Sequence, residues 1–301
     1  MAALPHRQAS RHKCHWADKS CCKNLVAARE GRLYRRGMGE TDTRTQPRQN
    51  SRRITFFSVP VDLLTLEQTV GRAEQAMADR HSIRHTALNV AKLVNLRKDK
   101  ELATDVCESD IVGIDGMGIV LGLRLFGLKS ARRVAGIDLM YALLDHCARS
   151  GRRPYILGAR QEHLDRAINI ARSRFPGLEL AGSRNGYFQP EEEKTVVAEI
   201  ATSGADCLFV AMPTPRKERF LNRHAAALNV PFIMGVGGSV DVLAGSIARA
   251  PGWMQRIGLE WLHRLYMEPR KMFWRYARTN TAYLALLMKA LMKQNNPVND
   301  A

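Results

Sequence analysis

The sequence predicts an α/β fold in which helices cover both faces of a mostly parallel sheet. Short apolar segments, typical of buried strands, alternate with longer segments whose apolar residues recur every three to four positions. This alternation begins at Ile54 and runs to about residue 248. Regular strand–helix alternation favours parallel strands joined by helical crossovers on both faces of a sheet.

The first half of the predicted fold is marked by apolar segments and by a helix start signal. The segment "TLEQTVGRAEQAMADR" has the spacing of an amphipathic helix, and Thr65 is an N-cap residue type. In chain order we expect a strand with a turn at 54–64, a helix at 65–80, a strand ending near Asn89, a helix through Lys100, a strand at 110–115 and a helix that begins after Gly116.

The second half repeats the pattern. "RPYILGAR" at 153–160 is an apolar strand that runs into a glycine turn. We expect it to be followed by a helix to Arg174, a strand and turn at 179–188, a helix at 191–204, a strand at 206–215, a helix at 216–228 and a strand that enters a glycine-rich loop at 230–245.

The chain carries a formal charge of +17 at pH 7. A field of this sign favours partners that bear phosphate, which include nucleic acid, anionic lipid and diphosphate ligands. Residues 1–50 hold eleven basic and four acidic side chains without sustained periodicity, so we expect a basic disordered leader and linker at 1–53. An α/β catalytic domain at 54–248 and a C-terminal amphipathic helical appendage at 249–301 complete the expected organisation.

No apolar run reaches the roughly 18–20 residues that a membrane-spanning helix needs, and the N-terminus lacks the apolar core of a signal peptide. The six cysteines have no spacing typical of a disulfide scaffold. We therefore expect reduced thiols and a cytoplasmic protein. The segment "HKCHWADKSCC" at 12–22 lacks the paired C-x-x-C spacing of zinc sites, so we expect no metal centre there.

Four turns at predicted strand ends hold glycine or polar residues: "LN" at 88–89, "DGMG" at 115–118, "LGAR" at 157–160 and "GVGGSVD" at 235–241. Ligands of parallel sheets bind at the carboxyl ends of the strands, where glycine and free helix N–H groups can approach phosphate. Asp115 is the best catalytic candidate, because desolvation at such a position raises a carboxyl pKa toward that of a general base. An aspartate that only caps the next helix fits the local pattern equally well.

Several common sites are missing from the sequence. "GVGGSVD" is not the G-x-G-x-x-G dinucleotide fingerprint, which disfavours a small-molecule dehydrogenase. No G-x-x-x-x-G-K-[ST] phosphate loop, no Asp-x-Asp pair and no serine nucleophile elbow occur. A nucleic-acid-binding protein that uses its basic charge remains the alternative, although no recognisable nucleic-acid-binding motif is present.

Seven segments in this order carry a family resemblance: "DGMGIV", "RRVAGIDLM", "NGYF", "PRKE", "GVGGSVDVLAG", "RAPGWMQRIGLEWLHRL" and "EPRKMFWRY". The chain resembles the WecG/TagA/CpsF family of glycosyltransferases over roughly residues 54–280. The resemblance implies a Rossmann-like α/β core with a C-terminal appendage near the active site and the membrane. It also implies cofactor-free, metal-independent, inverting transfer of a sugar (N-acetylmannosamine-type, glucose or related) from a UDP-sugar to a polyprenyl-diphosphate-linked acceptor. Such a reaction serves cell-surface or exopolysaccharide synthesis at the inner face of the cell membrane.

The resemblance places the base that deprotonates the acceptor hydroxyl on Asp115, and it places donor or phosphate contacts on Arg133 with Asp138 nearby. Arginines in or beside the appendage are expected to neutralise pyrophosphate. The expected substrate-binding residues come from the strand-end turns, from the family motifs and from the appendage. They are Asn89, Gly116, Arg133, Asp138, Gly158, Tyr187, Lys217, Glu218, Gly237, Gly238, Asp241, Arg249, Arg256, Arg264, Arg270 and Arg275.

The chain departs from the family pattern at two positions. The threonine of the family's T-x-N turn is Ala87 here, so any role of that hydroxyl is absent or falls to Thr86. The usual P-K-Q-E reads Pro-Arg-Lys-Glu at 215–218, which puts a cation in place of a neutral amide. This second change bears on the donor sugar.

The basic and aromatic segment 249–278 is expected to form two helices, one begun by Pro251 and one begun near Pro269. In the first, Ile257, Trp261 and Leu265 form an apolar stripe and Glu260 can pair with Arg264. The second is basic and amphipathic and continues to Lys293, which favours contact of residues 270–293 with a membrane surface. Contact between copies in a homo-oligomer and plain core packing remain alternatives for this segment.

Overall fold

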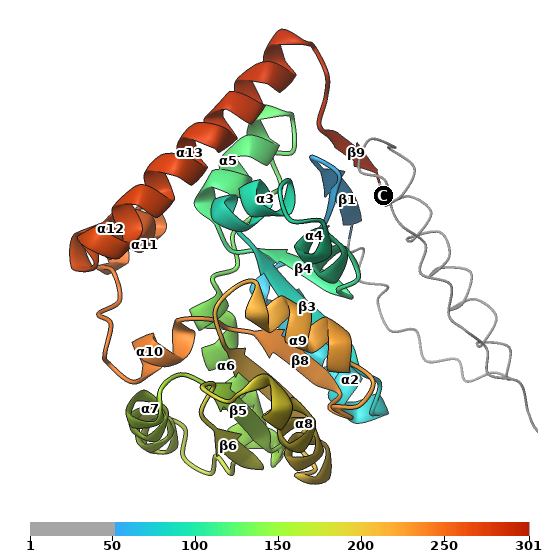
Figure 1. Cartoon of the computed structure of the whole chain (residues 1–301), viewed down its shortest axis with the longest axis vertical. Coiled ribbons are helices and arrows are strands. Elements are labelled where there is room, and N and C mark those ends of the chain that lie inside the picture. The colour runs from blue at the N-terminus through green and yellow to red at the C-terminus, as the bar shows by residue number, and fades with distance from the viewer. Residues whose placement is uncertain (1–51, 301) are drawn as a thin grey trace, which may run out of the picture. The chain divides into compact units, whose positions relative to one another are not determined.

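The structure is a computed structural model that describes residues 52–300. Its centre is a six-stranded sheet in the order β4-β3-β8-β7-β5-β6, and every neighbouring pair of strands is parallel. The predicted mostly parallel sheet is therefore confirmed (Figure 1). Its strands are β3 (Ile83–Leu88), β4 (Ile111–Ile114), β5 (Pro154–Gly158), β6 (Gly182–Arg184), β7 (Cys207–Ala211) and β8 (Phe232–Gly235).

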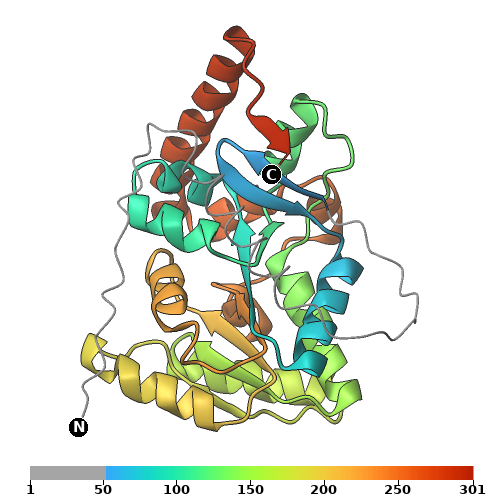
Figure 2. The ribbon, with the colours of Figure 1, turned by 90° about the vertical axis from the view of Figure 1, so that its right-hand side faces the viewer.

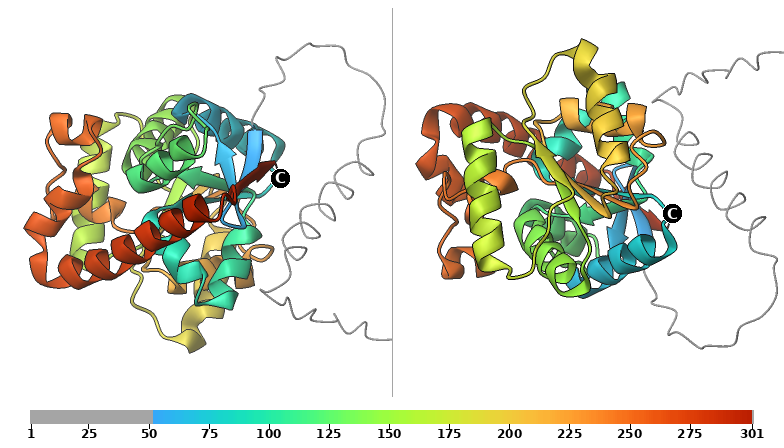
Figure 3. Two further views of the ribbon diagram at one scale, coloured as in Figure 1. Left: turned by 90° about the horizontal axis from the view of Figure 1, so that it is seen from above. Right: turned by 90° about the horizontal axis from the view of Figure 1, so that it is seen from below.

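Side chains alternate across this sheet and build a core on each face. Ile156, Phe209 and Met234 point to one face, and Leu208 and Ile233 point to the other. Helices α2, α6, α7 and α10 cover the first face, and α8 and α9 cover the second (Figure 3). The helices around the sheet are α2 (Leu66–Asp79), α3 (Val90–Leu96), α4 (Lys100–Cys107), α5 (Met117–Leu125), α6 (Gly136–Ser150), α7 (Gln161–Arg174), α8 (Glu193–Thr202), α9 (Arg216–His224) and α10 (Ser239–Leu243), with a 3₁₀ turn, η1 (Pro190–Glu192), before α8.

Local signals account for several helix ends. The predicted Thr65 N-cap is confirmed: its hydroxyl accepts from the N–H of Gln68 at 3.2 Å, and the Gln68 side chain accepts from the Thr65 N–H at 2.9 Å. The single helix expected through Lys100 is wrong, because the chain forms α3 and then α4. Asp99 ends the connection and caps α4 by accepting from the N–H of Leu102 at 3.0 Å. The sequence patterns also missed α6 entirely.

A second, antiparallel sheet joins the two ends of the described chain. It consists of β1 (Arg52–Phe56), β2 (Val59–Leu63) and β9 (Val298–Asp300) in the order β2-β1-β9 (Figure 2). Phe57 and Ser58 both have positive φ, as a two-residue hairpin turn requires. The carboxylate of Asp62 accepts from the N–H of Val112 at 2.7 Å and so joins this hairpin to β4.

The appendage contains three helices, α11 (Gly252–Arg256), α12 (Glu260–Met267) and α13 (Pro269–Met292), rather than the two expected. The additional break lies at Gly258, which has φ +78° and packs so closely that a Cβ there would lie 2.4 Å from Cγ of Met117. Ile257 thus falls outside α12, and its side chain is 58% exposed. The predicted stripe through Ile257, Trp261 and Leu265 is therefore wrong.

Helix α13 lies across α5 and α3 (Figure 1). The hydroxyl of Tyr283 donates to the carbonyl of Gly118 at 2.9 Å. At Gly122 a Cβ would lie 2.0 Å from that hydroxyl, so the glycine leaves the space that Tyr283 fills. Because α5 begins directly after Asp115 and Gly116, this contact fixes the appendage beside the predicted catalytic turn.

Candidate functional site

Asp115 lies between β4 and α5, at the carboxyl edge of the main sheet. Its N–H donates to the carbonyl of Leu88 at 2.9 Å, and its Oδ1 accepts from the N–H of Gly136 at 3.1 Å. The N-cap of α5 is Gly116, and no side chain caps that helix end. The reading of Asp115 as a cap of the next helix is therefore wrong, since its bonded oxygen binds the start of α6 instead.

Two further strand ends meet Asp115 at this edge. A Cβ on Gly116 would lie 3.0 Å from Cβ of Asn89, so the two turns are in close contact. The side chain of Asn89 accepts from the N–H of Lys92 at 2.9 Å and caps α3. Asn89 and Asp115 thus end neighbouring parallel strands with their side chains at the ligand-binding end of the sheet.

Arg133 connects the turn that holds Asp115 to the appendage. Its Nε donates to the carbonyl of Asp115 at 2.7 Å, and a terminal nitrogen forms an ion pair with Glu260 of α12. The expected pairing of Glu260 with Arg264 is therefore wrong. The cause is tertiary packing. Helix α12 packs against the loop that precedes α6, and there Glu260 pairs with the partly buried guanidinium of Arg133.

A groove of about 390 Å³ opens beside this ion pair. It runs between α5, the start of α6 and the appendage helices α11 and α12. Its lining combines four arginines with two carboxylates and a few apolar side chains: Met117, Val120, Arg124, Arg132, Arg133, Ala135, Asp138, Gln255, Arg256 and Glu260. Arg133, Asp138 and Arg256 are among the predicted binding residues. Arg124, Arg132 and Gln255 are not, and the available sequence signal for them was that they lie close to the predicted motifs.

The remaining predicted appendage arginines have different positions. Arg249 pairs with Asp138 at 2.6 Å, so two predicted binding residues partner each other. Arg264 lies over the glycine turn, since a Cβ on Gly238 would be 2.9 Å from one of its terminal nitrogens. Arg270 and Arg275 are exposed on α13, and no bond within residues 52–300 joins either to the groove.

The glycine turn after β8 holds the next group of predicted residues. Gly237 has φ +53°, and Gly238 precedes the short helix α10. Asp241 in that helix lies 2.7 Å from Nδ1 of His163 in α7. His163 was not predicted from the sequence. Its partner Asp241 lies 78 residues away in the chain, so no local sequence pattern reveals the contact.

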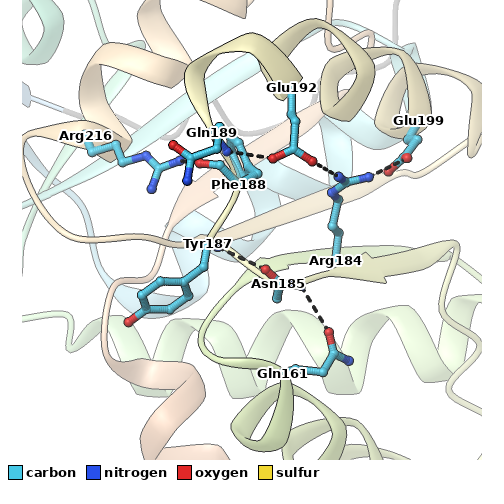
Figure 4. Close-up of polar contacts among 9 residues, drawn as sticks. All are labelled: Gln161, Arg184, Asn185, Tyr187, Phe188, Gln189, Glu192, Glu199 and Arg216. Carbon is cyan, nitrogen blue, oxygen red and sulfur yellow. Dashed lines mark hydrogen bonds and ion pairs between the residues drawn. The ribbon is translucent and has the colours of Figure 1, made fainter.

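The "NGYF" segment presents Tyr187 at the ends of β5 and β6. The Asn185 side chain accepts from the Tyr187 N–H at 3.1 Å and donates to Gln161 at 3.3 Å (Figure 4). The Tyr187 ring points away from these bonds and is 70% exposed. Nearby, Gly158 has φ +116°, and a Cβ there would lie 2.7 Å from the Ala211 backbone. The backbone of the turn is therefore closely packed, whereas the ring of Tyr187 is exposed to solvent.

Lys217 and Glu218 are buried at the start of α9. Glu218 Oε1 lies 2.9 Å from Lys92 Nζ and 3.4 Å from Lys217 Nζ. The two lysines hold the pKa of Glu218 at about 2, although burial alone raises it. Lys92 was not predicted; its position three residues after the Asn89 cap was the available signal.

Between residues 52 and 300 no helix is both long and apolar enough to cross a membrane. Nor does this range contain three or more His, Cys, Asp or Glu side chains arranged to hold a metal ion. Residues 1–51 of the predicted leader and linker, which include the histidine- and cysteine-containing segment at 12–22, lie outside the described residues, whereas Arg52 and Arg53 begin β1.

A carboxylate, several arginines and glycine turns at the carboxyl edge of a parallel sheet define an α/β ligand-binding enzyme. Residues 54–297 match the family described as "Glycosyl transferase WecG/TagA/CpsF family". The chain belongs to this family and is a glycosyltransferase.

Two similar proteins carry the same name, N-acetylglucosaminyldiphosphoundecaprenol N-acetyl-beta-D-mannosaminyltransferase. The one from Bacillus subtilis (strain 168) is 32% identical over 182 residues, which cover 60% of this chain and 68% of the relative. The one from Bacillus spizizenii is 33% identical over 181 residues, which cover 60% of this chain and 69% of the relative.

Proposed function

We propose that this enzyme transfers a sugar from a UDP-sugar to a sugar linked to polyprenyl diphosphate, with inversion at the anomeric carbon. The names of the two Bacillus relatives support the acceptor class, since those proteins act on N-acetylglucosaminyl-diphospho-undecaprenol. The donor sugar is N-acetylmannosamine-type, glucose or a related sugar. The product serves cell-surface or exopolysaccharide synthesis.

The observation that carries the proposal is the four-arginine groove, which is joined to Asp115 because Arg133 lines the groove and donates to the Asp115 carbonyl. Asp115 acts as the general base that removes the proton from the attacking acceptor hydroxyl. Its Oδ1 is oriented by the Gly136 N–H, while Oδ2 has no hydrogen-bond partner within residues 52–300 and is available to the hydroxyl. Arginine suits the diphosphates because its planar guanidinium binds phosphate oxygens in pairs.

The donor lies along the glycine turn and the exposed Tyr187 in this proposal. Gly237 and Gly238 let the backbone approach the diphosphate, and the Tyr187 ring offers a stacking surface for the base. Asp241 and Gly158 flank this path. Charge that develops on the departing UDP is stabilised by arginines and helix N–H groups, so the reaction needs no bound metal.

The acceptor lipid brings the enzyme to the inner face of the cell membrane. Exposed apolar side chains flank the groove on α5 (Leu121 and Leu125), on α11 (Trp253) and directly after α11 (Ile257). A further exposed stripe on α13 consists of Leu284, Met288, Leu291 and Met292. Such apolar faces beside basic side chains are typical of helices that lie in a membrane interface. Residues 270–293 are the proposed contact, and the same face is the one available to a second copy of the chain.

The test is acceptor-dependent UDP release from a panel of UDP-sugars, with N-acetylglucosaminyl-diphospho-prenol as acceptor and ADP- and GDP-sugars as controls. We expect release with at least one UDP-sugar, none without acceptor, and a product of inverted anomeric configuration by NMR. Equal turnover of ADP- or GDP-sugars, a retained configuration, or no release with any UDP-sugar would each contradict the proposal.

A further inference from the structure

Tyr276 lies on the face of α13 that packs against the body of the protein. Residues of this face recur every three to four positions, and Met272, Thr279 and Tyr283 among them are buried. Tyr276 falls in the same register and is partly buried. Its ring meets the ring of Trp261 in α12 edge to face, with the centroids 6.0 Å apart and the planes at 87°. The ring is therefore held between the two appendage helices.

The two tyrosines of this face differ in what their hydroxyl groups bind. The hydroxyl of Tyr283 donates to the carbonyl of Gly118 and joins α13 to α5. No hydrogen bond within residues 52–300 engages the hydroxyl of Tyr276, and its oxygen is not one of the buried polar atoms that lack a partner. Such a hydroxyl can donate to a ligand without first breaking a bond to this part of the chain.

Charged groups from three parts of the fold act on the Tyr276 hydroxyl. Burial raises the pKa of Tyr276, and the charges of Arg264 and Arg275 oppose this rise. The charges of Asp115 and Glu268 add to it. Because the pKa stays above its ordinary value, the hydroxyl keeps its proton at pH 7 and is a hydrogen-bond donor.

Two of these charged groups lie at the carboxyl edge of the main sheet. Asp115 follows β4, and Arg264 lies over the turn after β8, since a Cβ on Gly238 would be 2.9 Å from one of its terminal nitrogens. Both groups act on Tyr276, so its hydroxyl faces this edge. Parallel sheets bind their ligands there.

The surroundings of the hydroxyl favour an anionic acceptor. A neutral O–H beside two guanidinium groups matches an oxygen with negative charge, because hydrogen bonds to charged oxygens are the short and strong ones. Asp115 carries such oxygens, but no bond within residues 52–300 joins it to Tyr276. A phosphate group offers several acceptor oxygens and suits the neighbouring arginines as well.

We propose that the Tyr276 hydroxyl donates a hydrogen bond to a diphosphate oxygen of a bound substrate. Helix α13, which the sequence assigns to membrane contact, thereby contributes a side chain to the binding site. The inference rests on the proposed transferase function, whose donor and acceptor both carry a diphosphate. The hydroxyl keeps its proton throughout, and its role is binding.

The experiment compares the full chain with Tyr276→Phe, which keeps the ring and its contact with Trp261. Calorimetry at pH 7 measures the dissociation constants of UDP, of uridine and of geranyl diphosphate. We expect the variant to bind at least one of the two diphosphates roughly 10-fold more weakly, because a hydrogen bond to a charged group is lost. Its affinity for uridine should equal that of the wild type.

Two further tyrosines serve as controls. Tyr266→Phe changes a side chain of α12 that is 82% exposed, so it should bind all three compounds as the wild type does. Tyr283→Phe removes the bond to Gly118 and should lower the melting temperature. Tyr276→Phe should melt as the wild type does, which separates a ligand contact from a structural one.

The two diphosphates distinguish the substrates. Weaker binding of UDP assigns the hydroxyl to the donor, and weaker binding of geranyl diphosphate assigns it to the acceptor; either result supports the proposal. Equal weakening of UDP and uridine would place the ring against the nucleoside and overturn it.

Unchanged affinity for both diphosphates, with wild-type turnover intact, would overturn the Tyr276 proposal alone. If those affinities are unchanged but the acid limb of the profile of kcat/KM against pH shifts, the hydroxyl acts on Asp115 instead, which also overturns it. A wild-type protein that binds neither diphosphate and releases no UDP from any UDP-sugar would contradict the proposed transferase function as well.

Discussion

Arg133 donates from Nε to the main-chain oxygen of Asp115 at 2.7 Å. The other end of the same guanidinium pairs with Glu260 in the appendage. One side chain therefore links the turn that carries the proposed base to the helices that complete the groove. The position of the appendage and the geometry of the base are coupled through this arginine.

Arg133→Lys should lower kcat strongly with a smaller change in KM. A single ammonium group cannot bind both the Asp115 carbonyl and the Glu260 carboxylate, which the guanidinium contacts through different nitrogens. Misplacement of a reacting group by about 1 Å costs roughly 100-fold in rate. Steady-state kinetics of the variant test this expectation. Arg149→Lys, an exposed change in α6, is the matched control and should retain full kcat. Unchanged kcat in Arg133→Lys would show that the link is dispensable.

Gly258→Ala should destabilise the junction of α11 and α12. Alanine is strained at φ +78°, and its Cβ would collide with Met117 in the first turn of α5. We expect a loss of about 1–3 kcal/mol of unfolding free energy together with reduced activity. Gly252→Ala has no atom within 4 Å of the new Cβ and should be neutral by both thermal unfolding and activity. Equal behaviour of the two variants would argue against a close fit at Gly258.

The buried Lys217 should cost stability at neutral pH. Its folded pKa of about 8 lies below the ordinary value of 10.5, so the unfolded chain binds more protons between these pH values and wild-type stability rises across them. Lys217→Met should therefore raise the melting temperature at pH 7, and this advantage should shrink as the pH rises from 8 to 10.5. Thermal melts across that range test the sign. A lower melting temperature for Lys217→Met at pH 7 would show that the ammonium stabilises the fold.

Glu218→Gln should have the opposite effect, because it leaves two buried ammonium groups without a carboxylate. We expect a loss of about 3–5 kcal/mol at pH 7. The folded pKa of Glu218 is about 2 and its ordinary value is 4.5, so its stabilising contribution is complete above pH 4.5 and is lost as the pH falls toward 2. The difference from wild type, measured by urea unfolding, should shrink in that acidic window. Glu162→Gln, on the surface of α7, is the control.

The exposed stripe on α13 predicts binding to anionic vesicles. Replacing Leu284 and Met288 together by serine should weaken co-sedimentation with phosphatidylglycerol vesicles, because apolar burial in the interface is lost. Ile170→Ser in α7 changes an exposed apolar side chain elsewhere and should have no effect. If the double variant sediments as wild type does, residues 270–293 are not the membrane contact.

The main sheet could be predicted from the sequence because buried parallel strands are apolar on both faces and end in recognisable turns. The same strand-end signal predicts that Asn89, Asp115 and Gly237 lie at the carboxyl edge of the main sheet. The pairing of Arg133 with Glu260 could not be predicted, since it depends on where α12 packs. The break at Gly258 was missed for a similar reason, because contact with Met117 selects its conformation.

Partners distant in sequence explain the other differences. Strand β9 pairs with β1 from the far end of the chain, and its three residues have no recognisable strand pattern of their own. Lys217 is predicted as a cation at an amide position, but its shared carboxylate and the role of Lys92 depend on the ion pair that joins α3 to the start of α9 in the folded chain. The division of the chain at residues 53 and 248 stays a prediction.

Asp115 is the proposed base in an acceptor-dependent transfer. Its most direct test is UDP release by Asp115→Asn with a UDP-sugar turned over by the wild type and N-acetylglucosaminyl-diphospho-prenol, alongside the exposed control Asp165→Asn. The asparagine oxygen still accepts from the Gly136 N–H, so the fold should persist, and we predict a fall in kcat of about 10²–10⁴-fold with the control unchanged. Wild-type kcat in Asp115→Asn would contradict the claim.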